Sequence, residues 1–367
     1  MFKQYKLRNF KFILVMYVAV LNIIGILLIG SARESVQGKQ IFGMVMGLAV
    51  MLVVSLIDYN FILRFSWAIY GFMTGILLLV MIAGKNAGGA QRWFEIGGFR
   101  FQPSELAKIL IILFFASYLM RHEEKLNTPK VLLSSFLLAA IPLVLILKQP
   151  DLSTTIVTAL IFASLLFVAG LSYKIVTGVL AVGIPSFIIM FTLLIQDKIP
   201  FIEAYQVTRI MAWLYPDDYP ADAYQQQNSI MAIGSGQLWG KGLNNTEATS
   251  VINGNFIPEP QTDFIFAVAG EELGFIGTVV IIILLLFITI ECILIARKAK
   301  DTAGRLICCG FAALIGFQSL INISVASGLL PNTGLPLPFV SYGLTSLLSL
   351  YIGVGLVLNV GLQPKKY

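Results

Sequence analysis

The sequence has little charge. Asp, Glu, Lys and Arg make up 12% of its 367 residues, against 57% hydrophobic residues. This balance excludes a soluble domain, which needs a far more polar surface, and indicates a polytopic membrane protein. The formal net charge of +6 is modest. In a membrane protein such a basic excess indicates loops that face the cytoplasm, so we expect no nucleic-acid partner.

Cysteine and histidine are also scarce. The three cysteines, Cys292, Cys308 and Cys309, lie in or beside apolar stretches, which excludes a disulfide framework and metal-type spacing. The single histidine, His122, lies in a polar inner loop and is expected to be solvent-exposed, so histidine catalysis has no candidate on the outer face. Linkers, low-complexity tracts and clear repeats are missing too. Residues 1–367 are therefore predicted to form a single domain.

Long apolar runs, by contrast, recur along the whole chain. A membrane crossing takes roughly 20 residues, so the runs predict an all-α polytopic protein with about ten transmembrane helices. The predicted spans are 11–31, 39–57, 65–84, 104–120, 131–148, 152–170, 173–195, 264–296, 305–330 and 337–361. Helices 7 and 8 are joined by a predicted long extracellular loop, about residues 197–262, in which 224–239 favour a short interfacial helix.

Basic residues set the expected orientation of the chain. Lys3, Lys6 and Arg8 precede the first span, which lacks a convincing cleavage site and is expected to remain as an uncleaved helix. If the N-terminus is cytoplasmic, the segments on the cytoplasmic side carry more Lys and Arg than the much longer segments on the outer side. The asymmetry predicts that both termini are cytoplasmic.

A lone carboxylate, Asp263, stands where the long loop enters the eighth span. Pro258 and Pro260 mark the loop just before it, because each fixes φ and removes a backbone donor. Glu271 and Glu272 follow inside the span. Ionisable groups at such depth usually face a protein interior or a water-filled cavity. Asp263 is therefore the leading candidate for a functional acid, and the two glutamates are expected to pair inside the bundle.

A second charged pair stands at the start of the fourth span. Ser104 is an N-cap candidate, and Glu105 would lie in the favourable first turn. Glu105 and Lys108 are three residues apart and share a helix face. Two interpretations stay open: a structural ion pair at the membrane edge, or a lysine held by glutamate to receive an anion such as phosphate.

Other polar residues could join the same outer cavity. Asp151 either caps the sixth span or faces Asp263, with which it could share a proton or a cation. Arg209 and Lys241 are the cations of the long loop, where a solvated surface position is the usual outcome. Residues 328–343, which include Ser341, break helix geometry repeatedly. Broken backbone at membrane depth is tolerated only where it is buried or lines a cavity, so this segment is placed beside Asp263.

Six motifs occur in order along nearly the whole chain. They are GAQRW (89–93), QPSELAK (102–108), QPDL (149–152), TDFIFA (262–267), GEELG (270–274), and GLLP with PLPFVSYG (328–331 and 336–343). Together they resemble the SEDS family of bacterial cell-wall proteins, which includes RodA, FtsW and SpoVE. One departure is Leu344-Thr345, where the family usually has Gly-Ser, and this bears on local packing.

The resemblance implies a ten-helix peptidoglycan glycosyltransferase in the bacterial cytoplasmic membrane. Its substrate would be lipid II, a disaccharide-pentapeptide on undecaprenyl pyrophosphate, used at the outer face. The essential acid of the family falls on Asp263, its paired acid and base on Glu105 and Lys108, and its acid after Gln-Pro on Asp151. The family works with a class B penicillin-binding protein, a transpeptidase, among other membrane proteins of elongation or division complexes.

These residue types suit the chemistry of glycan polymerisation. An acceptor sugar hydroxyl attacks the anomeric carbon of an α-linked donor, and Asp263 can accept its proton as the bond forms, giving a β-linked product. Cations must meet the leaving pyrophosphate, and apolar grooves between helices would hold the polyprenyl chains. Lys108 is the first candidate to meet the charge of the pyrophosphate, ahead of Arg209 and Arg92. The predicted substrate-binding residues are Lys108, Arg209, Arg92, Glu105, Asp151, Lys241 and Ser341. No cofactor is assigned, but Mg²⁺ or Mn²⁺ on Asp263 stays open, because hard cations bind carboxylate and phosphate oxygens.

Two other functions fit parts of the pattern. A lipid II flippase or transporter would also show many helices, broken segments and buried charges. Against it, the charges lie at the outer mouth rather than near the midplane, and no paired half-repeat is visible. A structural membrane scaffold is the third interpretation, and it leaves Asp263, Glu105 and Lys108 as helix-end polar groups only.

Overall fold

The structure is a computed structural model of the chain. It describes residues 9–87, 90–96, 99–195, 204–245, 250, 254 and 256–363. The basic residues Lys3, Lys6 and Arg8, which support the predicted orientation, lie outside the described residues. Two parts of the predicted extracellular loop, 196–203 and most of 246–255, also lie outside them.

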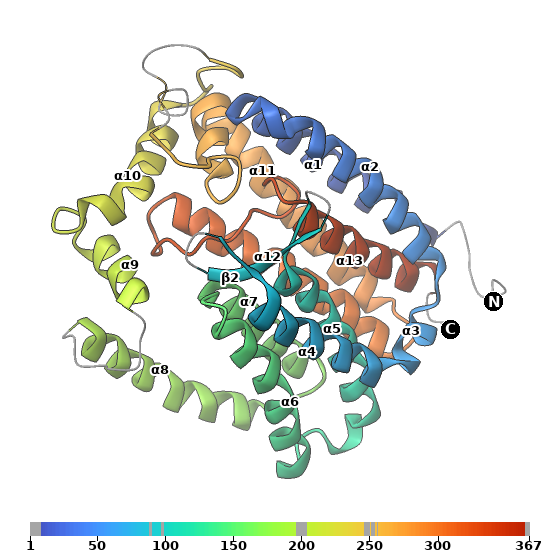
Figure 1. Ribbon diagram of the computed structural model, residues 1–367. Coiled ribbons are helices and arrows are strands. Elements are labelled where there is room, and N and C mark those ends of the chain that lie inside the picture. Colours follow the sequence, from blue (N-terminus) through green and yellow to red (C-terminus); the bar gives the residue numbers. More distant parts are fainter. Residues whose placement is uncertain are drawn as a thin grey trace.

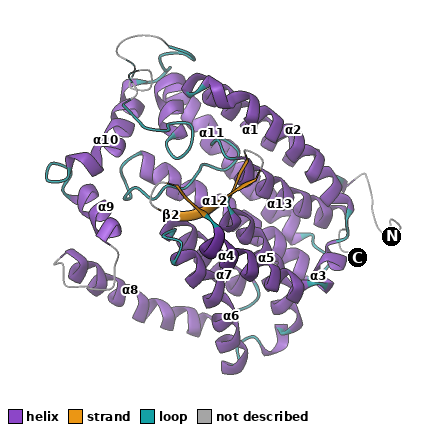
Figure 2. Cartoon of the chain, in the orientation of Figure 1, coloured by secondary structure: helices purple, strands orange, loops and turns teal. Residues whose placement is uncertain are grey.

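Helices dominate the described part of the chain (Figures 1 and 2). Nine of them are long and apolar enough to cross a membrane: α1 (Phe12–Ala32), α2 (Glu34–Leu56), α4 (Ser66–Ala83), α5 (Pro103–Arg121), α6 (Pro129–Leu147), α8 (Tyr173–Ile195), α11 (Ile265–Arg297), α12 (Thr302–Ala326) and α13 (Leu344–Leu362). The helix α7 (Leu152–Val168) is apolar but shorter. The prediction of about ten membrane helices is confirmed.

The start of the first span and the end of the last span lie at the same membrane face. Lys11, just before α1, lies beside Gly361 of α13: an ideal Cβ on Gly361 would be 3.5 Å from Lys11 Cγ. A chain whose first and last spans end on the same face crosses an even number of times. This favours ten crossings, with α7 as a short span, and it places the starts of α5, α7, α11 and α13 together on the opposite face.

Short elements connect the spans. They are α3 (Tyr59–Arg64), a 3₁₀ turn (Glu123–Lys125), α9 (Ala204–Leu214) and α10 (Pro220–Ser235). The predicted helix in the long loop is confirmed as α10, although it begins before residue 224, and α9 was not predicted. In the 3₁₀ connection, His122 is partly buried and its Nδ1 lies 2.8 Å from the carbonyl of Tyr118, so the expectation of a solvent-exposed ring was wrong.

A small antiparallel sheet follows α4 and adds strands to the predicted all-helical chain. Its order is β1 (Lys85–Ala87), β2 (Ala90–Ile96) and β3 (Phe99–Phe101). Thr345 ties the sheet to the first turn of α13, since its hydroxyl donates to the carbonyl of Arg100 at 3.1 Å. The same hydroxyl accepts from the backbone N–H of Gln102 at 3.3 Å. The strand β2 contacts α4 and α5, the two spans that the sheet connects.

Burial is very uneven among the spans. The helices α5, α12 and α13 are buried along most of their lengths, whereas α8 exposes almost every side chain and lies apart from the bundle in Figure 1. Lipid is as apolar as leucine, so helices associate in a membrane through close packing that small residues permit. On α2, Gly43 and Gly47 face α13, where an added Cβ would come within 2.6 Å of Leu344 and 2.1 Å of Tyr351.

Two boundary predictions need correction, and one span has an unpredicted interruption. The helix α5 begins at Pro103, with Gln102 as the capping position, so Ser104 is inside the helix and not its N-cap. Proline suits this first helical position because its missing N–H has no partner there anyway. The last span begins at Leu344 rather than at 337, which leaves 331–343 without regular structure. Finally, α11 is interrupted at Gly274, whose φ is 66°.

Candidate functional site

Asp263 lies in the turn that precedes α11, on the membrane face opposite to the chain ends. Its carboxylate is partly buried. Across from it lies Gly334 of the irregular segment 331–343: an ideal Cβ there would be 3.3 Å from Asp263 Oδ2. Gly334 has a φ of 74°, a conformation that glycine adopts without steric cost. The structure thus brings the broken segment against the acid, as the sequence predicted.

The surroundings of Asp263 change its acidity. The pKa of this carboxyl is raised from 3.8 to about 6, and burial is the largest cause. The charges of Glu259 and Asp151 also raise the pKa, whereas Arg209 and, more weakly, Arg92 lower it. An acid with a pKa near 6 is about nine-tenths ionised at pH 7 and is a stronger base than an ordinary aspartate. The position therefore suits proton acceptance at neutral pH.

The broken segment is fastened to the turn before α11 by Ser341. Its hydroxyl donates to the carbonyl of Thr262 at 2.6 Å and accepts from the backbone N–H of Leu337 at 2.7 Å. The backbone N–H of Tyr342 donates to the carbonyl of Gln261 at 2.8 Å. These bonds fix the segment next to Asp263. They give Ser341 a positioning role, and its predicted contact with substrate stays a prediction.

Glu105 and Lys108 form a covered ion pair below the mouth of the site. Lys108 Nζ lies 2.8 Å from Glu105 Oε1, and only 1% of the Lys108 side chain and 5% of the Glu105 side chain is exposed. Lys108 also donates to Gln318 Oε1 at 2.7 Å. The geometry supports the structural interpretation of this pair. A contact between Lys108 and a phosphate would need the surrounding helices to move, so that role stays a prediction.

Two amides of α12 connect this pair to Asp263. Gln318 Nε2 donates to the carbonyl of Pro336 at 2.8 Å. Asn322, four residues later on the same helix face, donates to the carbonyls of Leu335 and Asp263 at 2.6 and 2.8 Å. Both amides satisfy carbonyls that lack a helical partner. The Lys108 ammonium, the broken segment and the Asp263 backbone therefore form one buried polar network.

Asp151 caps α7, as the first of its two interpretations predicted, and it lies near enough to Asp263 to affect the pKa of that carboxyl. A proton or cation shared by the two carboxylates stays a prediction. The Oδ1 of Asp151 accepts from the backbone N–H of Thr154 at 3.1 Å and so caps α7. Its Oδ2 accepts from Gln102 Nε2 at 3.2 Å and lies 3.9 Å from Arg92 Nη1. Because Arg92 and Asp151 also affect the pKa of Asp263, the sheet and α7 belong to the same electrostatic environment. Their contact with substrate stays a prediction.

Arg209 reaches the site from α9. Its Nη1 donates to the carbonyl of Asn332 at 3.4 Å, and its charge is the strongest influence that lowers the pKa of Asp263. The helix is held in place by Trp213, whose indole N–H donates to the carbonyl of Gly328 at 2.8 Å. Of the two cations predicted in the long loop, Arg209 is therefore the one whose charge acts on Asp263.

Lys241 lies elsewhere, at the interruption of α11. Its Nζ is 2.8 Å from Glu271 Oε1, so the expectation of a solvated charge was wrong. Its backbone N–H donates to the carbonyl of Glu271, while the N–H groups of Phe275 and Ile276 donate to loop carbonyls at 2.8 and 3.2 Å. The loop thus replaces helical bonds lost at Gly274. The predicted pairing inside the bundle is confirmed for Glu271. Glu272 accepts a hydrogen bond from Ser31 instead, and among the described residues its Oε2 has no hydrogen-bond partner.

The chain alone offers an incomplete metal site. Within the described ranges, no group of three His, Cys, Asp or Glu side chains is placed to hold an ion. Asp263 supplies a hard carboxylate ligand, so Mg²⁺ or Mn²⁺ there would take further ligands from water or from phosphate oxygens. A cation at Asp263 would therefore need ligands from the substrate.

Sequence reasoning missed four features of the site. Gln318 and Asn322 are amides four residues apart in an apolar helix, a pattern that could have indicated an inward polar face. The tight approach of Gly334 to Asp263 has no sequence signal beyond a glycine among prolines. The sheet that carries Arg92 was also missed.

Taken together, the fold and site define a multi-pass membrane protein with a partly buried carboxylate of raised pKa at one membrane face. The chain matches the cell cycle protein family of FtsW, RodA and SpoVE over residues 4–366. It is 37% identical over 335 residues to the peptidoglycan glycosyltransferase MrdB of Escherichia coli K12, covering 89% of this chain and 86% of the relative. It is 32% identical over 380 residues to a probable peptidoglycan glycosyltransferase FtsW of Geobacter sp. M18, covering 98% and 99%.

Solved structures of this family have the same fold as this chain. One chain of a peptidoglycan synthase complex that coordinates polymerization and crosslinking superposes with a TM-score of 0.80 at 28% identity, covering 96% of this chain and 97% of that one. The rod shape determining protein RodA of Thermus thermophilus gives 0.69 at 27% identity, covering 96% of each chain. The chain belongs to the SEDS family of FtsW, RodA and SpoVE, and it is a peptidoglycan glycosyltransferase of the bacterial cytoplasmic membrane.

Proposed function

We propose that this chain polymerises lipid II into glycan strands on the outer face of the cytoplasmic membrane, with Asp263 as the general base. The observation that carries the proposal is the position of Asp263: a partly buried carboxylate at the mouth of α11, beside Gly334, with a pKa raised to about 6. Such an acid is ionised at neutral pH and is still basic enough to accept a proton during bond formation.

The reaction is a direct displacement. The acceptor hydroxyl oxygen forms a bond to the anomeric carbon of the donor while the bond from that carbon to the lipid pyrophosphate oxygen breaks. The hydroxyl proton passes to Asp263, and the electron pair of the broken bond leaves with undecaprenyl pyrophosphate. Attack from the side opposite to an α-linked leaving group gives a β-linked product.

Cations near Asp263 would stabilise the leaving group. Arg209 and Arg92 both act on the pKa of Asp263, so their charges reach the reacting region. They are better placed for the pyrophosphate than Lys108, whose ammonium is covered by Glu105 and Gln318. This ordering reverses the expectation from sequence, in which Lys108 came first.

Partners and orientation follow from the same assignment. A structural relative belongs to a peptidoglycan synthase complex that couples polymerization to crosslinking. By analogy, this chain would act with a class B penicillin-binding protein and other membrane proteins of elongation or division, in a role in cell shape, elongation or division. An outer site on the face opposite to Lys11 and Gly361 would put both termini in the cytoplasm, and the basic residues that precede α1 in the sequence support this orientation.

The experiment compares glycan synthesis with lipid transfer. The purified chain in liposomes receives lipid II, with and without its class B penicillin-binding protein. Glycan strands are separated on gels, and the lipid II in each leaflet is quantified in parallel. Polymer formation by the wild-type chain supports the proposal. Movement of lipid II between leaflets without polymer under any condition would establish the flippase alternative instead.

A further inference from the structure

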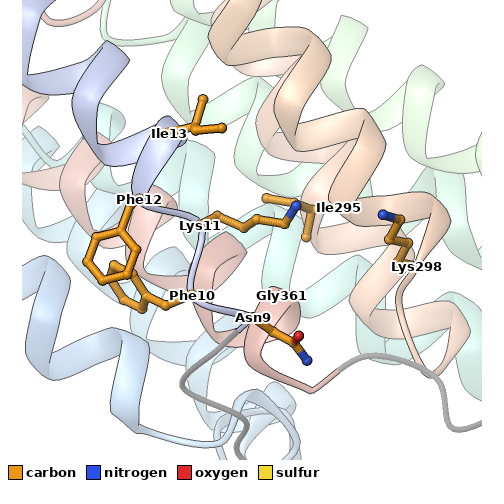
Figure 3. Close-up of a pocket in the computed structure, with 8 residues that line it drawn as sticks. All are labelled: Asn9, Phe10, Lys11, Phe12, Ile13, Ile295, Lys298 and Gly361. Atoms are coloured by element: carbon orange, nitrogen blue, oxygen red, sulfur yellow. The ribbon is translucent and has the colours of Figure 1, made fainter.

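A cavity of about 410 Å³ lies at the far end of the bundle from Asp263. It is lined by residues 9–13, Ile295, Lys298 and Gly361 (Figure 3). These residues come from the start of α1, the end of α11 and the end of α13. Ile295 is separated from Asp263 by almost the whole of α11, whose part after the interruption at Gly274 is alone about 30 Å long at 1.5 Å per residue. The cavity is therefore separate from the glycosyltransferase site.

Two ammonium groups reach this cavity from different helices. In Figure 3 the side-chain nitrogens of Lys11 and Lys298 both point toward Ile295, from opposite sides. Lys11 Nζ lies 3.4 Å from Glu291 Oε1, while Lys298 forms no ion pair with any carboxylate in the described part of the chain. The two lysines and one glutamate leave a net positive charge at the cavity, and an anion of charge −1 would complement it.

The flank of the cavity is apolar and open to lipid. Phe12 is 71% exposed and Ile13 is 54% exposed at the start of a membrane span. Phe10 packs on Phe12, with ring centroids 4.6 Å apart. A polar, positively charged hollow thus adjoins an exposed apolar surface at the level where a membrane helix begins.

We propose that this cavity binds the headgroup of an anionic phospholipid from the leaflet that faces the chain ends. The phosphodiester would lie between Lys11 and Lys298, and the acyl chains would run along Phe12 and Ile13. Basic pockets between membrane helices at this level are suited to such headgroups, because each lysine near an anionic surface contributes attraction. Free inorganic phosphate shares the charge but gains nothing from the apolar flank. This inference does not rest on the proposed polymerase mechanism.

Gly361 is a position at which a larger side chain can be used to test the cavity. An ideal Cβ there would meet Lys11 Cγ at 3.5 Å and Ile295 Cγ2 at 3.6 Å, which are ordinary contacts. The direction of that Cβ is into the cavity. Gly361→Leu would therefore occupy the cavity without changing any charge, and it tests the location of the lipid independently of the lysines.

The test measures retention of phosphatidylglycerol by native mass spectrometry. The full chain is purified in detergent and titrated with phosphatidylglycerol, with phosphatidylcholine and with inorganic phosphate. The variants are Lys298→Gln, Lys298→Arg, Lys11→Gln/Lys298→Gln and Gly361→Leu, with Lys130→Gln as the control, an exposed lysine on the same membrane face. Lys298 is itself exposed, so its single substitution leaves the fold intact.

The expected result is one tightly retained phosphatidylglycerol on the wild type, Lys298→Arg and Lys130→Gln. Affinity falls about fivefold in Lys298→Gln and about 10- to 30-fold in the double variant. Gly361→Leu also loses the retained lipid. Equal retention of phosphatidylcholine, competition by inorganic phosphate at equal concentration, or unchanged retention in both the double variant and Gly361→Leu would overturn the proposal.

Discussion

Gly334 lies close against the carboxylate of Asp263: a Cβ on Gly334 would be 3.3 Å from Asp263 Oδ2, closer than most Cβ contacts, on a backbone with φ of 74°. Two elements far apart in the sequence therefore meet at this carboxylate. One is the turn before α11, and the other is the irregular segment between α12 and α13. Their contact is secured by Ser341 and by Asn322.

Gly334→Ala should lower the rate of glycan polymerisation at least tenfold while the protein still folds. The new methyl group crowds the carboxylate and forces a strained backbone, and a displacement of about 1 Å at a reacting group can reduce the rate by two orders of magnitude. Gly343→Ala is the matched control in the same segment, because its Cβ would meet only Ser346 Cβ at 3.7 Å. Equal activity of the two variants would contradict the positioning role of Gly334.

The rate of polymerisation should rise between pH 5 and pH 7 with a midpoint near 6. Asp263 must be ionised to act as a base, and its pKa is raised to about 6, so activity is lost as the pH falls through that value. Arg209→Gln should move the midpoint up, since the arginine lowers this pKa, and Glu259→Gln should move it down. Asp218→Asn, an exposed acid outside the group that affects Asp263, is the control. Midpoints that do not move in these opposite directions would exclude Asp263 as the titrating group.

The buried ion pair of Glu105 and Lys108 should stabilise the fold and not bind substrate. Lys108→Met leaves a buried carboxylate without its partner, which costs about 3–5 kcal/mol and should lower the thermal unfolding temperature strongly. Glu105→Gln/Lys108→Met removes both charges and should recover much of that stability. If Lys108 instead binds the donor pyrophosphate, the single variant would keep its unfolding temperature and raise the KM for lipid II, and the double variant would not recover activity.

Lys241 should act through the interruption of α11 rather than through substrate. Its ammonium pairs with Glu271, and the loop beside it supplies the bonds that Gly274 removes from the helix. Lys241→Met should therefore lower the unfolding temperature, and Lys241→Arg should keep it. The comparison uses thermal unfolding together with the KM for lipid II. A raised KM at unchanged stability would return Lys241 to the substrate-binding residues.

Much of the fold could be predicted because its signals are local. Apolar runs of about 20 residues identify membrane spans directly, and a lone carboxylate such as Asp263 at the end of one is conspicuous. The motifs that resemble the SEDS family then placed Glu105, Lys108, Asp151 and Asp263 in one protein class before any geometry was known. The family assignment and the helical class were both confirmed.

The remaining features depend on contacts between distant segments. Lys241 was expected to be solvated, but its partner Glu271 is 30 residues away and the pairing requires the break at Gly274. Likewise, the burial of Lys108 depends on Gln318 from another helix. Short strands such as those flanking Arg92 carry too few residues for a period-two pattern to be distinctive. Tertiary packing thus decided which charges are covered and which face Asp263.

The most direct measurement compares glycan polymerisation by the wild-type chain and by Asp263→Asn, with lipid II binding measured on the same preparations. The amide has nearly the same shape but cannot accept the proton, and loss of a general base typically costs 10²–10⁴-fold in rate. The account predicts a loss of at least a hundredfold with lipid II affinity within a few fold of the wild type. Polymerisation by Asp263→Asn within tenfold of the wild-type rate would contradict it.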